Sequence, residues 1–232
     1  MPTANKNQQH AGLLLDLSIE NYMEIFRLQE LLHERRLKKM IPDVVIMLEH
    51  TPCFTIGRSG SREHILVDDS ILNQHGITVH ETSRGGDITY HGPGQLVCYP
   101  ILSLDENRDL HAYARKMEEV MIRTLAAFEI TAGRKPEYPG VWVEDRKIGA
   151  MGIAVRKWIT MHGISLNVFP DLRHFSFIIP CGITSYGVTS MSEIKSGPID
   201  IKTVRTEMCN QFSRIFNMEL QSTTLEQLTG EE

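Results

Sequence analysis

The sequence of 232 residues contains few cysteines: four, at positions 53, 98, 181 and 209, with no CxxC pair among them. Cysteines spread this thinly exclude a small scaffold held together by disulfides. They are typical of reduced thiols in an intracellular protein. We therefore expect the protein to act in the cytoplasm.

Long apolar runs and an excess of basic charge are also missing. No stretch approaches the ~20 apolar residues that span a bilayer. The first residues, MPTANKNQQHAG, are polar and lack the apolar core of a secretory signal. The formal charge of −5 and the pI of about 6.1 argue against a general nucleic-acid binder, which is normally basic. We expect neither a membrane segment nor a nucleic-acid partner.

Repeats and low-complexity blocks do not occur either, and 41% of the residues are hydrophobic. This composition and length suit one globular domain. We expect a polar N-terminal tail at residues 1–11, one folded domain at 12–220 and a C-terminal tail at 221–232.

The hydrophobic pattern predicts an α+β fold. Apolar and β-branched runs predict strands at residues 13–17, 44–48, 53–56, 77–79, 96–102, 141–143, 148–155, 159–168 and 177–179. Helical periodicity predicts one helix from an N-cap at Ser18 to Met40 and two more at 109–130 and 200–218. Because there is no regular βαβ alternation, we expect a single domain with a mixed, mostly antiparallel sheet and flanking helices.

Residues 84–100, RGGDITYHGPGQLVCYP, combine four glycines with polar side chains. Glycine allows a ligand to approach the main chain closely. Exposed N–H groups beside Arg84 can receive a carbonyl oxygen or a phosphate. The spacing matches neither GxxxxGK[ST] nor GxGxxG, which argues against the common nucleotide cradles. The pattern alone also fits a pair of tight turns between strands.

Cys181 is the candidate nucleophile among the four cysteines. It stands between a proline and a glycine at the end of an apolar run, IIPCGI, where a thiol can face a cleft. Cys53, Cys98 and Cys209 instead fit packed positions in strands and a helix. An inert, buried thiol at Cys181 fits its local context as well.

Lys147 is the candidate partner of that thiol. A nucleophilic thiol needs a base or a cation, and the sequence neighbours of Cys181 supply none. Lys147 opens KIGAMGIAV, in which Gly149 and Gly152 leave one side of a strand bare. A lysine desolvated there loses its proton readily or stabilises a thiolate. The alternative is a lysine that faces solvent in a hairpin.

Four segments, in this order and spacing, resemble the lipoyl/octanoyl transferases of the lipoate–protein ligase B type. They are RGGDITYHGPGQLVCYPIL from residue 84, PGVWVEDRKIGAMGI from 139, HGISLNV from 162 and IIPCGI from 178. The resemblance covers about residues 13–218. It implies a core like that of biotin protein ligases and class II tRNA synthetases, with residues 12–220 as the acyltransferase catalytic domain.

The resemblance also implies the site residues. It maps the thiol nucleophile onto Cys181 and its lysine partner onto Lys147. Asp87 stands at a position that the family varies, and Cys53 stands where valine is expected. The acyl-binding positions map onto three segments: Arg84, Gly85, Gly86, Asp87, Ile88, Thr89, Tyr90 and His91; Ala150, Met151 and Gly152; and Gly163, Ile164 and Ser165.

A member of this family transfers an octanoyl group from acyl carrier protein to a lysine of a lipoyl domain, the first step of lipoate assembly. The implied acceptors are the lipoyl domains of 2-oxo acid dehydrogenases and the glycine cleavage H protein, and neither ATP nor a metal is implied. The alternatives are an ATP-dependent lipoate ligase on the same scaffold, transfer between two lipoyl-bearing proteins, a thioesterase, and a non-catalytic module that binds acyl carrier protein.

Basic residues at 35–39, 134–135, 146 and 156–157 fit docking of acidic carrier and lipoyl domains. They fit an ordinary solvated surface equally well. The run at 35–39 also suits the C-terminal end of a helix, where cations meet the negative end of the helix dipole.

Overall fold

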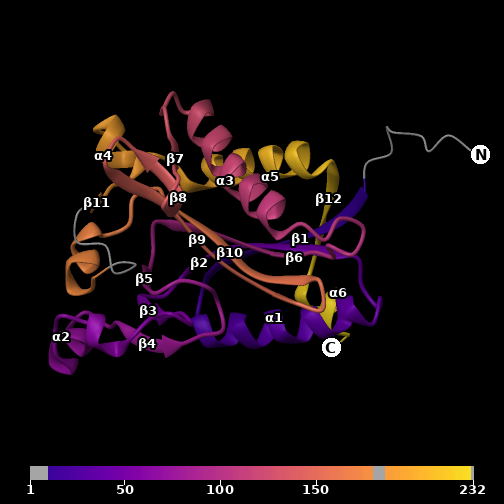
Figure 1. Cartoon of the computed structure of the whole chain (residues 1–232), viewed down its shortest axis with the longest axis horizontal. Helices are drawn as coiled ribbons and strands as arrows, with labels where there is room; N and C mark the ends of the chain where they lie inside the picture. Colours follow the sequence, from indigo (N-terminus) through magenta and orange to yellow (C-terminus); the bar gives the residue numbers. More distant parts are fainter. Residues whose placement is uncertain (1–9, 180–185, 231–232) are drawn as a thin grey trace, which may run out of the picture.

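The computed structural model describes residues 10–179 and 186–230, which form a nine-stranded sheet and a three-stranded sheet (Figure 1). The order of the large sheet is β12-β1-β2-β6-β10-β9-β8-β7, with β11 paired to β9. Its strands are β1 (His10–Glu20), β2 (Asp43–His50), β6 (Gln95–Ile101), β7 (Gly133–Lys135), β8 (Tyr138–Val143), β9 (Arg146–Arg156), β10 (Ile159–Asn167), β11 (Gly187–Val188) and β12 (Met218–Thr223).

The large sheet is mixed. β1 pairs in parallel with β12 and β2, and β11 pairs in parallel with β9. The other neighbouring strands pair antiparallel. This arrangement, with helices beside the sheet, confirms the fold class that we predicted.

Helices cover both faces of the large sheet, which is why its central strands β2, β6 and β10 are buried almost throughout. In β2, Val45 and Met47 join the core under α3 (Leu110–Ala127) and α5 (Ile201–Phe216). Val44, Ile46 and Leu48 point the other way, toward α1 (Tyr22–Leu37) and α6 (Leu225–Thr229) (Figure 1). A strand buried on both faces reads as a continuous hydrophobic run rather than as an alternating one. Within the described residues, no helix combines the length and hydropathy needed to cross a membrane.

The glycine-rich segment of residues 84–100 leads from the small sheet, through β5, into β6 of the large sheet. β3 (Cys53–Ile56) lies between β4 (Thr78–Glu81) and β5 (Ile88–His91). Side chains from β3 and β5 pack with α2 (Asp69–Gln74) and with the 3-10 helix Leu172–Phe177 in a separate core. α4 (Met191–Lys195) and the 3-10 helix Arg62–His64 complete the described elements.

The first helix begins later than we predicted, so the N-cap at Ser18 is wrong. β1 continues through a bulge, and Ile19 and Glu20 pair with β2. The helix begins only after Asn21, whose side chain accepts a hydrogen bond from the amide of Met23 at 2.9 Å. Strand pairing thus prevails over the local capping signal.

The strand predicted at 177–179 is also wrong. Residues Leu172–Phe177 form a 3-10 helix that begins after Asp171, whose side chain accepts a hydrogen bond from the amide of Arg173. Ile178 makes only an isolated bridge with Ile65. The 3-10 helix takes only Phe177 of the predicted strand, and pairing with the segment around Ile65 does not extend beyond this one bridge within the described residues.

The segment predicted as a tail from residue 221 contains ordered structure. It includes the end of β12, which pairs with β1, and α6, which packs on α1 through the fully buried Leu228. The folded part of the chain therefore reaches at least to Thr229.

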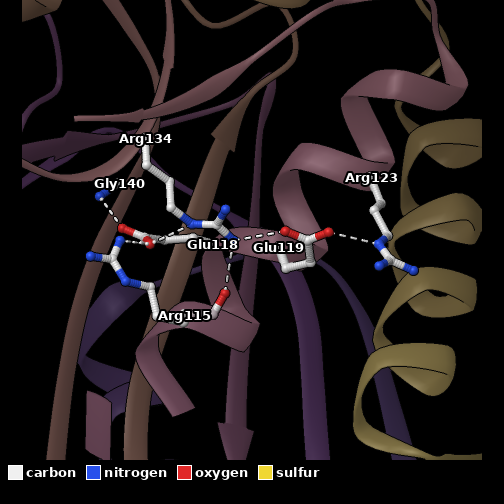
Figure 2. Close-up of polar contacts among 6 residues, drawn as sticks. All are labelled: Arg115, Glu118, Glu119, Arg123, Arg134 and Gly140. Atoms are coloured by element: carbon white, nitrogen blue, oxygen red, sulfur yellow. Dashed lines mark hydrogen bonds and ion pairs between the residues drawn. The ribbon is translucent and has the colours of Figure 1, made fainter. Parts of the chain in front are cut away.

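A buried glutamate joins α3 to β8, as Figure 2 shows. Glu118 is 3% exposed and accepts hydrogen bonds from Arg115 at 2.8 Å and from Arg134 at 3.0 Å. Its other oxygen accepts from the amide of Gly140 at 3.1 Å. Its neighbour Glu119 pairs with Arg134 and Arg123 nearer the surface. Glu118 therefore anchors the start of β8 to the helix layer.

We expect Glu118→Ala to lower the free energy of unfolding by about 2–3 kcal/mol, because it leaves a buried amide and two arginines without their shared acceptor. Glu119→Ala is the matched control and should cost no more than about 1 kcal/mol, since its ion pairs are solvated. Urea unfolding of both variants measures the difference. Equal losses would contradict the anchoring role of Glu118.

Candidate active site

A cavity lies where β5 meets β9 and β10. It is lined by Arg84, Gly86, Asp87, Thr89, His91, Tyr99, Ala150, Met151, Gly152, His162, Gly163, Ile164 and Ser165. The antiparallel register explains why two of the predicted segments meet here: Gly152 pairs with Gly163, Met151 with Ile164, and Ala150 with Ser165. The structure thus brings the three predicted acyl-binding segments together around one cavity.

Three predicted positions do not line this cavity. Ile88 and Tyr90 alternate with Thr89 and His91 along β5, so their side chains enter the core of the small sheet instead. The amide of Gly85 is bonded to the carbonyl oxygen of Ile153 at 3.0 Å, which ties the loop to β9.

Two residues that line the cavity were missed, Tyr99 and His162. His162 directly precedes Gly163 in the HGISLNV segment, so extending the motif by one residue would have found it. Tyr99 stands on β6 and reads in the sequence only as a strand aromatic. Its hydroxyl lies 2.9 Å from Nε2 of the buried His50.

Glycine is required at two points of the cavity wall. A Cβ atom at Gly163 would lie 2.1 Å from the carbonyl oxygen of Cys98, so β10 approaches β6 as bare backbone. Gly86 has φ +82°, a conformation that other residues rarely adopt. Part of the wall is therefore main chain, which leaves room for a ligand.

Arg84 is buried beneath the loop. Its guanidinium donates to the hydroxyl of Thr55 at 3.0 and 2.9 Å, to the carbonyl oxygen of Thr55 and to the carbonyl oxygen of Gly85 at 3.0 Å. Its side chain also packs against the Cα of Gly152. Arg84 therefore joins β3, the loop and β9 at the cavity.

Asp87 has a structural partner. Its carboxylate lies 2.8 Å from Nδ1 of His64 and accepts a hydrogen bond from the amide of Ile88 at 2.7 Å. The amides of Gly85 and Ile88 are thus committed to internal bonds and do not face a ligand.

His91 is held as a neutral acceptor. Gln95 donates its amide hydrogens to the carbonyl oxygen of Tyr90 and to Oδ1 of Asn167, so its oxygen accepts from Nδ1 of His91 at 2.6 Å. Burial lowers the pKa of His91 to about 3. The unprotonated Nε2 of His91 can therefore accept a hydrogen bond but not donate one.

The same hydrogen-bond chain reaches Lys147. Asn167 donates to the carbonyl oxygen of Thr189 at 3.0 Å, and the amide of Thr189 donates to the carbonyl oxygen of Lys147 at 3.0 Å. The chain from His91 to Lys147 thus fixes β5, β10 and β9 relative to one another.

Lys147 is half-buried on β9 and lines a second, smaller cavity. The lining residues are Thr89, Gln95, Lys147, Ala150, Asn167, Phe175 and Val188. Thr89 and Ala150 line both cavities, so Lys147 lies next to the predicted acyl-binding site. The alternative of a solvent-facing hairpin lysine does not describe this position.

We expected Gly149 and Gly152 to leave one side of β9 uncovered, but other side chains pack against both glycines. A Cβ atom at Gly149 would lie 2.6 Å from the sulfur of Met121, and one at Gly152 would lie 2.9 Å from Cδ of Arg84. The two glycines allow the helix layer and the loop to approach β9 closely.

Three cysteines are packed as predicted. Cys53 and Cys98 are fully buried, and burial raises the pKa of both thiols. Burial raises the pKa of the half-buried Cys209 to about 11. None of these thiols is a ready nucleophile at neutral pH. The candidate nucleophile Cys181 lies outside the described residues.

The chain matches a family model described as the lipoyl protein ligase A/B catalytic domain over residues 21–213. A protein named octanoyltransferase from Thermoanaerobacter sp. (strain X514) is 45% identical over 219 residues, covering 94% of this chain and 95% of its own. Another octanoyltransferase, from a Nostoc species, is 42% identical over 222 residues, covering 95% and 99%.

Solved structures share the fold at lower identity. A bipartite lipoate protein ligase from Thermoplasma acidophilum has a TM-score of 0.74 at 20% identity, covering 95% of this chain and 91% of that one. Lipoate-protein ligase A bound with ATP has a TM-score of 0.73 at 20% identity, and the match covers 96% of this chain and 93% of that one. Biotin protein ligase from Aquifex aeolicus has a TM-score of 0.54 at 16% identity, and the match covers 89% of this chain and 70% of that one. The predicted likeness to biotin protein ligases is confirmed.

The histidines of the site predict an acid-sensitive fold. Burial lowers the pKa of His91 and His162 to about 3 and that of His50 to about 4. Below pH 6.5 the unfolded chain therefore binds more protons than the folded one. The free energy of unfolding consequently decreases as the pH is lowered from 6.5 toward 4. Lowering the pH from 7 to 5 should reduce the free energy of unfolding by about 2 kcal/mol for each of these histidines.

Urea unfolding at both pH values measures this loss. His162→Gln should reduce the pH dependence by up to about 2 kcal/mol. His111→Gln, at an exposed position, is the control for loss of a histidine that is not buried. Equal stability of the wild-type chain at pH 7 and pH 5 would show that these histidines are not held neutral.

Proposed function

Because the chain belongs to the lipoyl protein ligase A/B catalytic-domain family and is an octanoyltransferase, we propose that it carries the octanoyl group as a thioester on Cys181. The donor is octanoyl-acyl carrier protein, and the acceptor is a lysine of a lipoyl domain. The observation that carries this proposal is the likeness, at 41–45% identity over most of the chain, to proteins named octanoyltransferase.

The position of Lys147 beside the predicted acyl-binding site supports its proposed role. Its side chain lines a cavity that shares Thr89 and Ala150 with the larger cavity beside it. That larger cavity has apolar wall residues in Met151 and Ile164, which suit a fatty chain. Each methylene buried there would contribute about 0.8 kcal/mol.

Acylation is the first half of the proposed reaction. Lys147 takes the proton of the Cys181 thiol, and the thiolate attacks the carbonyl carbon of the donor thioester. A new carbon–sulfur bond forms to Cys181, while the bond to the pantetheine sulfur breaks. That sulfur leaves with the proton that Lys147 held.

Transfer to the acceptor is the second half. The acceptor amine attacks the carbonyl carbon on Cys181, an amide bond forms and the carbon–sulfur bond breaks. Lys147 takes a proton from the attacking nitrogen and returns it to the thiolate. His91, neutral and with an accepting Nε2, is suited to orient an N–H group of the incoming amine.

The free energy of this cycle comes from the donor. Exchange between two thioesters is nearly balanced, and amide formation from a thioester is downhill. The proposed reaction therefore needs neither ATP nor a metal. The acceptors would be lipoyl domains of 2-oxo acid dehydrogenases and the glycine cleavage H protein, and the reaction would take place in the cytoplasm.

Several of the basic residues considered for docking already form ion pairs within the chain. Arg36 pairs with Asp43, and Arg134 bridges Glu118 and Glu119. Arg146 pairs with Glu193, and Lys135 pairs with Asp145. An acidic partner that docks here would have to contact these side chains while they keep their ion pairs within the chain.

We expect Cys181→Ala to abolish the octanoyl adduct that forms when the wild-type chain is incubated with octanoyl-acyl carrier protein. Intact-protein mass spectrometry measures the adduct. Cys209→Ala is the matched control and should acylate normally, because the Cys209 thiol is half-buried with a raised pKa. An adduct that persists on Cys181→Ala would refute the assignment, and acylation that requires ATP and free octanoate would indicate a ligase.

Lys147→Ala should slow acylation of Cys181 by about a hundredfold or more, the usual contribution of a general base. Single-turnover mass spectrometry follows the rate. A circular dichroism spectrum like that of the wild-type chain is the control for folding. A variant that acylates at the wild-type rate would remove Lys147 from the mechanism.

A further inference from the structure

Lys147 lies against an aromatic cluster that the mechanism above does not use. The cluster consists of Tyr138 and Trp142 on β8 and Tyr186 just before β11, with ring centroids 5.4–6.1 Å apart. The Nζ atom of Lys147 lies 4.9 Å from the centroid of the Trp142 ring. A second lysine, Lys135, lies 5.3 Å from the same ring and 4.0 Å from that of Tyr186.

The sheet register places Trp142 beside Lys147. The two residues are directly opposite each other on the antiparallel strands β8 and β9, so their side chains share one face. The register shifts between Val141 and Trp142, and this irregularity sets which β8 side chain meets Lys147. The indole is itself held, because it is 3% exposed and its Nε1 donates to the carbonyl oxygen of Tyr138 at 3.1 Å.

The strand that carries Trp142 is anchored from the helix layer. Glu118 accepts the amide of Gly140, two residues before Trp142, and is held by Arg115 and Arg134 (Figure 2). A Cβ atom at Gly140 would lie 3.5 Å from Cε of Lys147 and 2.5 Å from the carbonyl oxygen of Gly149. Bare backbone therefore brings β8 close to the Lys147 side chain.

We propose that Trp142 is a positioning residue for Lys147, and this inference rests on the proposed role of Lys147. The face of the indole attracts the ammonium and fixes Nζ at one place on β9. This fixed ammonium is the form that accompanies the Cys181 thiolate and then gives its proton to the departing pantetheine sulfur. Leucine at position 142 would supply neither the attraction nor the planar surface.

Kinetics of three variants test the proposal. Trp142→Leu should lower kcat and the single-turnover acylation rate about tenfold, with KM for octanoyl-acyl carrier protein within about twofold, because uniform substrate binding is not removed. Trp142→Phe keeps an aromatic face and should restore most of the rate. Trp158→Leu is the matched control at the other tryptophan, which contacts Arg108, and should have wild-type kinetics.

The contact itself has a spectroscopic readout. Trp158→Phe leaves Trp142 as the only tryptophan, since the sequence has two. In that background Lys147→Met should change the emission of Trp142, whereas Lys116→Met, which removes a lysine that contacts Phe216, should not.

Two results would overturn the inference: wild-type kcat in a folded Trp142→Leu, or equal kcat losses in the Leu and Phe variants, which would indicate a packing role alone. A failure of the proposed function would give a different result. In that case acylation would survive Lys147→Ala or Cys181→Ala, independently of the residue at position 142.

Discussion

The antiparallel ladder between β9 and β10 is the constraint on which the site depends. Its register sets Ala150, Met151 and Gly152 opposite Ser165, Ile164 and Gly163. A slip of one residue would turn every one of these side chains to the other face of the sheet. The same strand β9 carries Lys147, so the wall of the predicted acyl-binding cavity and the candidate base are parts of one ladder. This is the preorganisation that a catalytic arrangement requires.

Two buried histidines, His91 at the cavity and His50 behind Tyr99, are arranged to accept hydrogen bonds rather than to carry charge. His91 is fixed through Gln95 and Asn167, and His50 donates from Nδ1 to the carbonyl oxygen of Glu20 while its Nε2 accepts from Tyr99. Burial keeps both imidazoles neutral. These histidines therefore add no positive charge to the cavity.

Much of the site was predictable because its residues lie in contiguous motifs. The three wall segments were predicted from the resemblance of RGGDITYHGPGQ, KIGAMG and HGIS to the family's motifs. The glycines alone did not separate a ligand site from tight turns. The sequence reading missed Tyr99, which looks like any strand aromatic until β6 is paired with β10. The contact of Trp142 with Lys147 also depends on the register shift between Val141 and Trp142, which no local sequence pattern predicts. The wrong N-cap at Ser18 has the same origin, because tertiary pairing decided between two local options.

The pairing of β12 with β1 has a consequence for how the molecule is made. The two strands come from opposite ends of the described chain, yet they run side by side at one edge of the large sheet (Figure 1). Contacts between residues so distant in sequence slow folding, because the entropy of closing the long loop between them is lost before the contacts can stabilise the chain. During vectorial synthesis the edge of β1 stays open until the last strand leaves the ribosome. A nascent chain of this fold must therefore shield an unpaired strand edge from its neighbours for most of its synthesis.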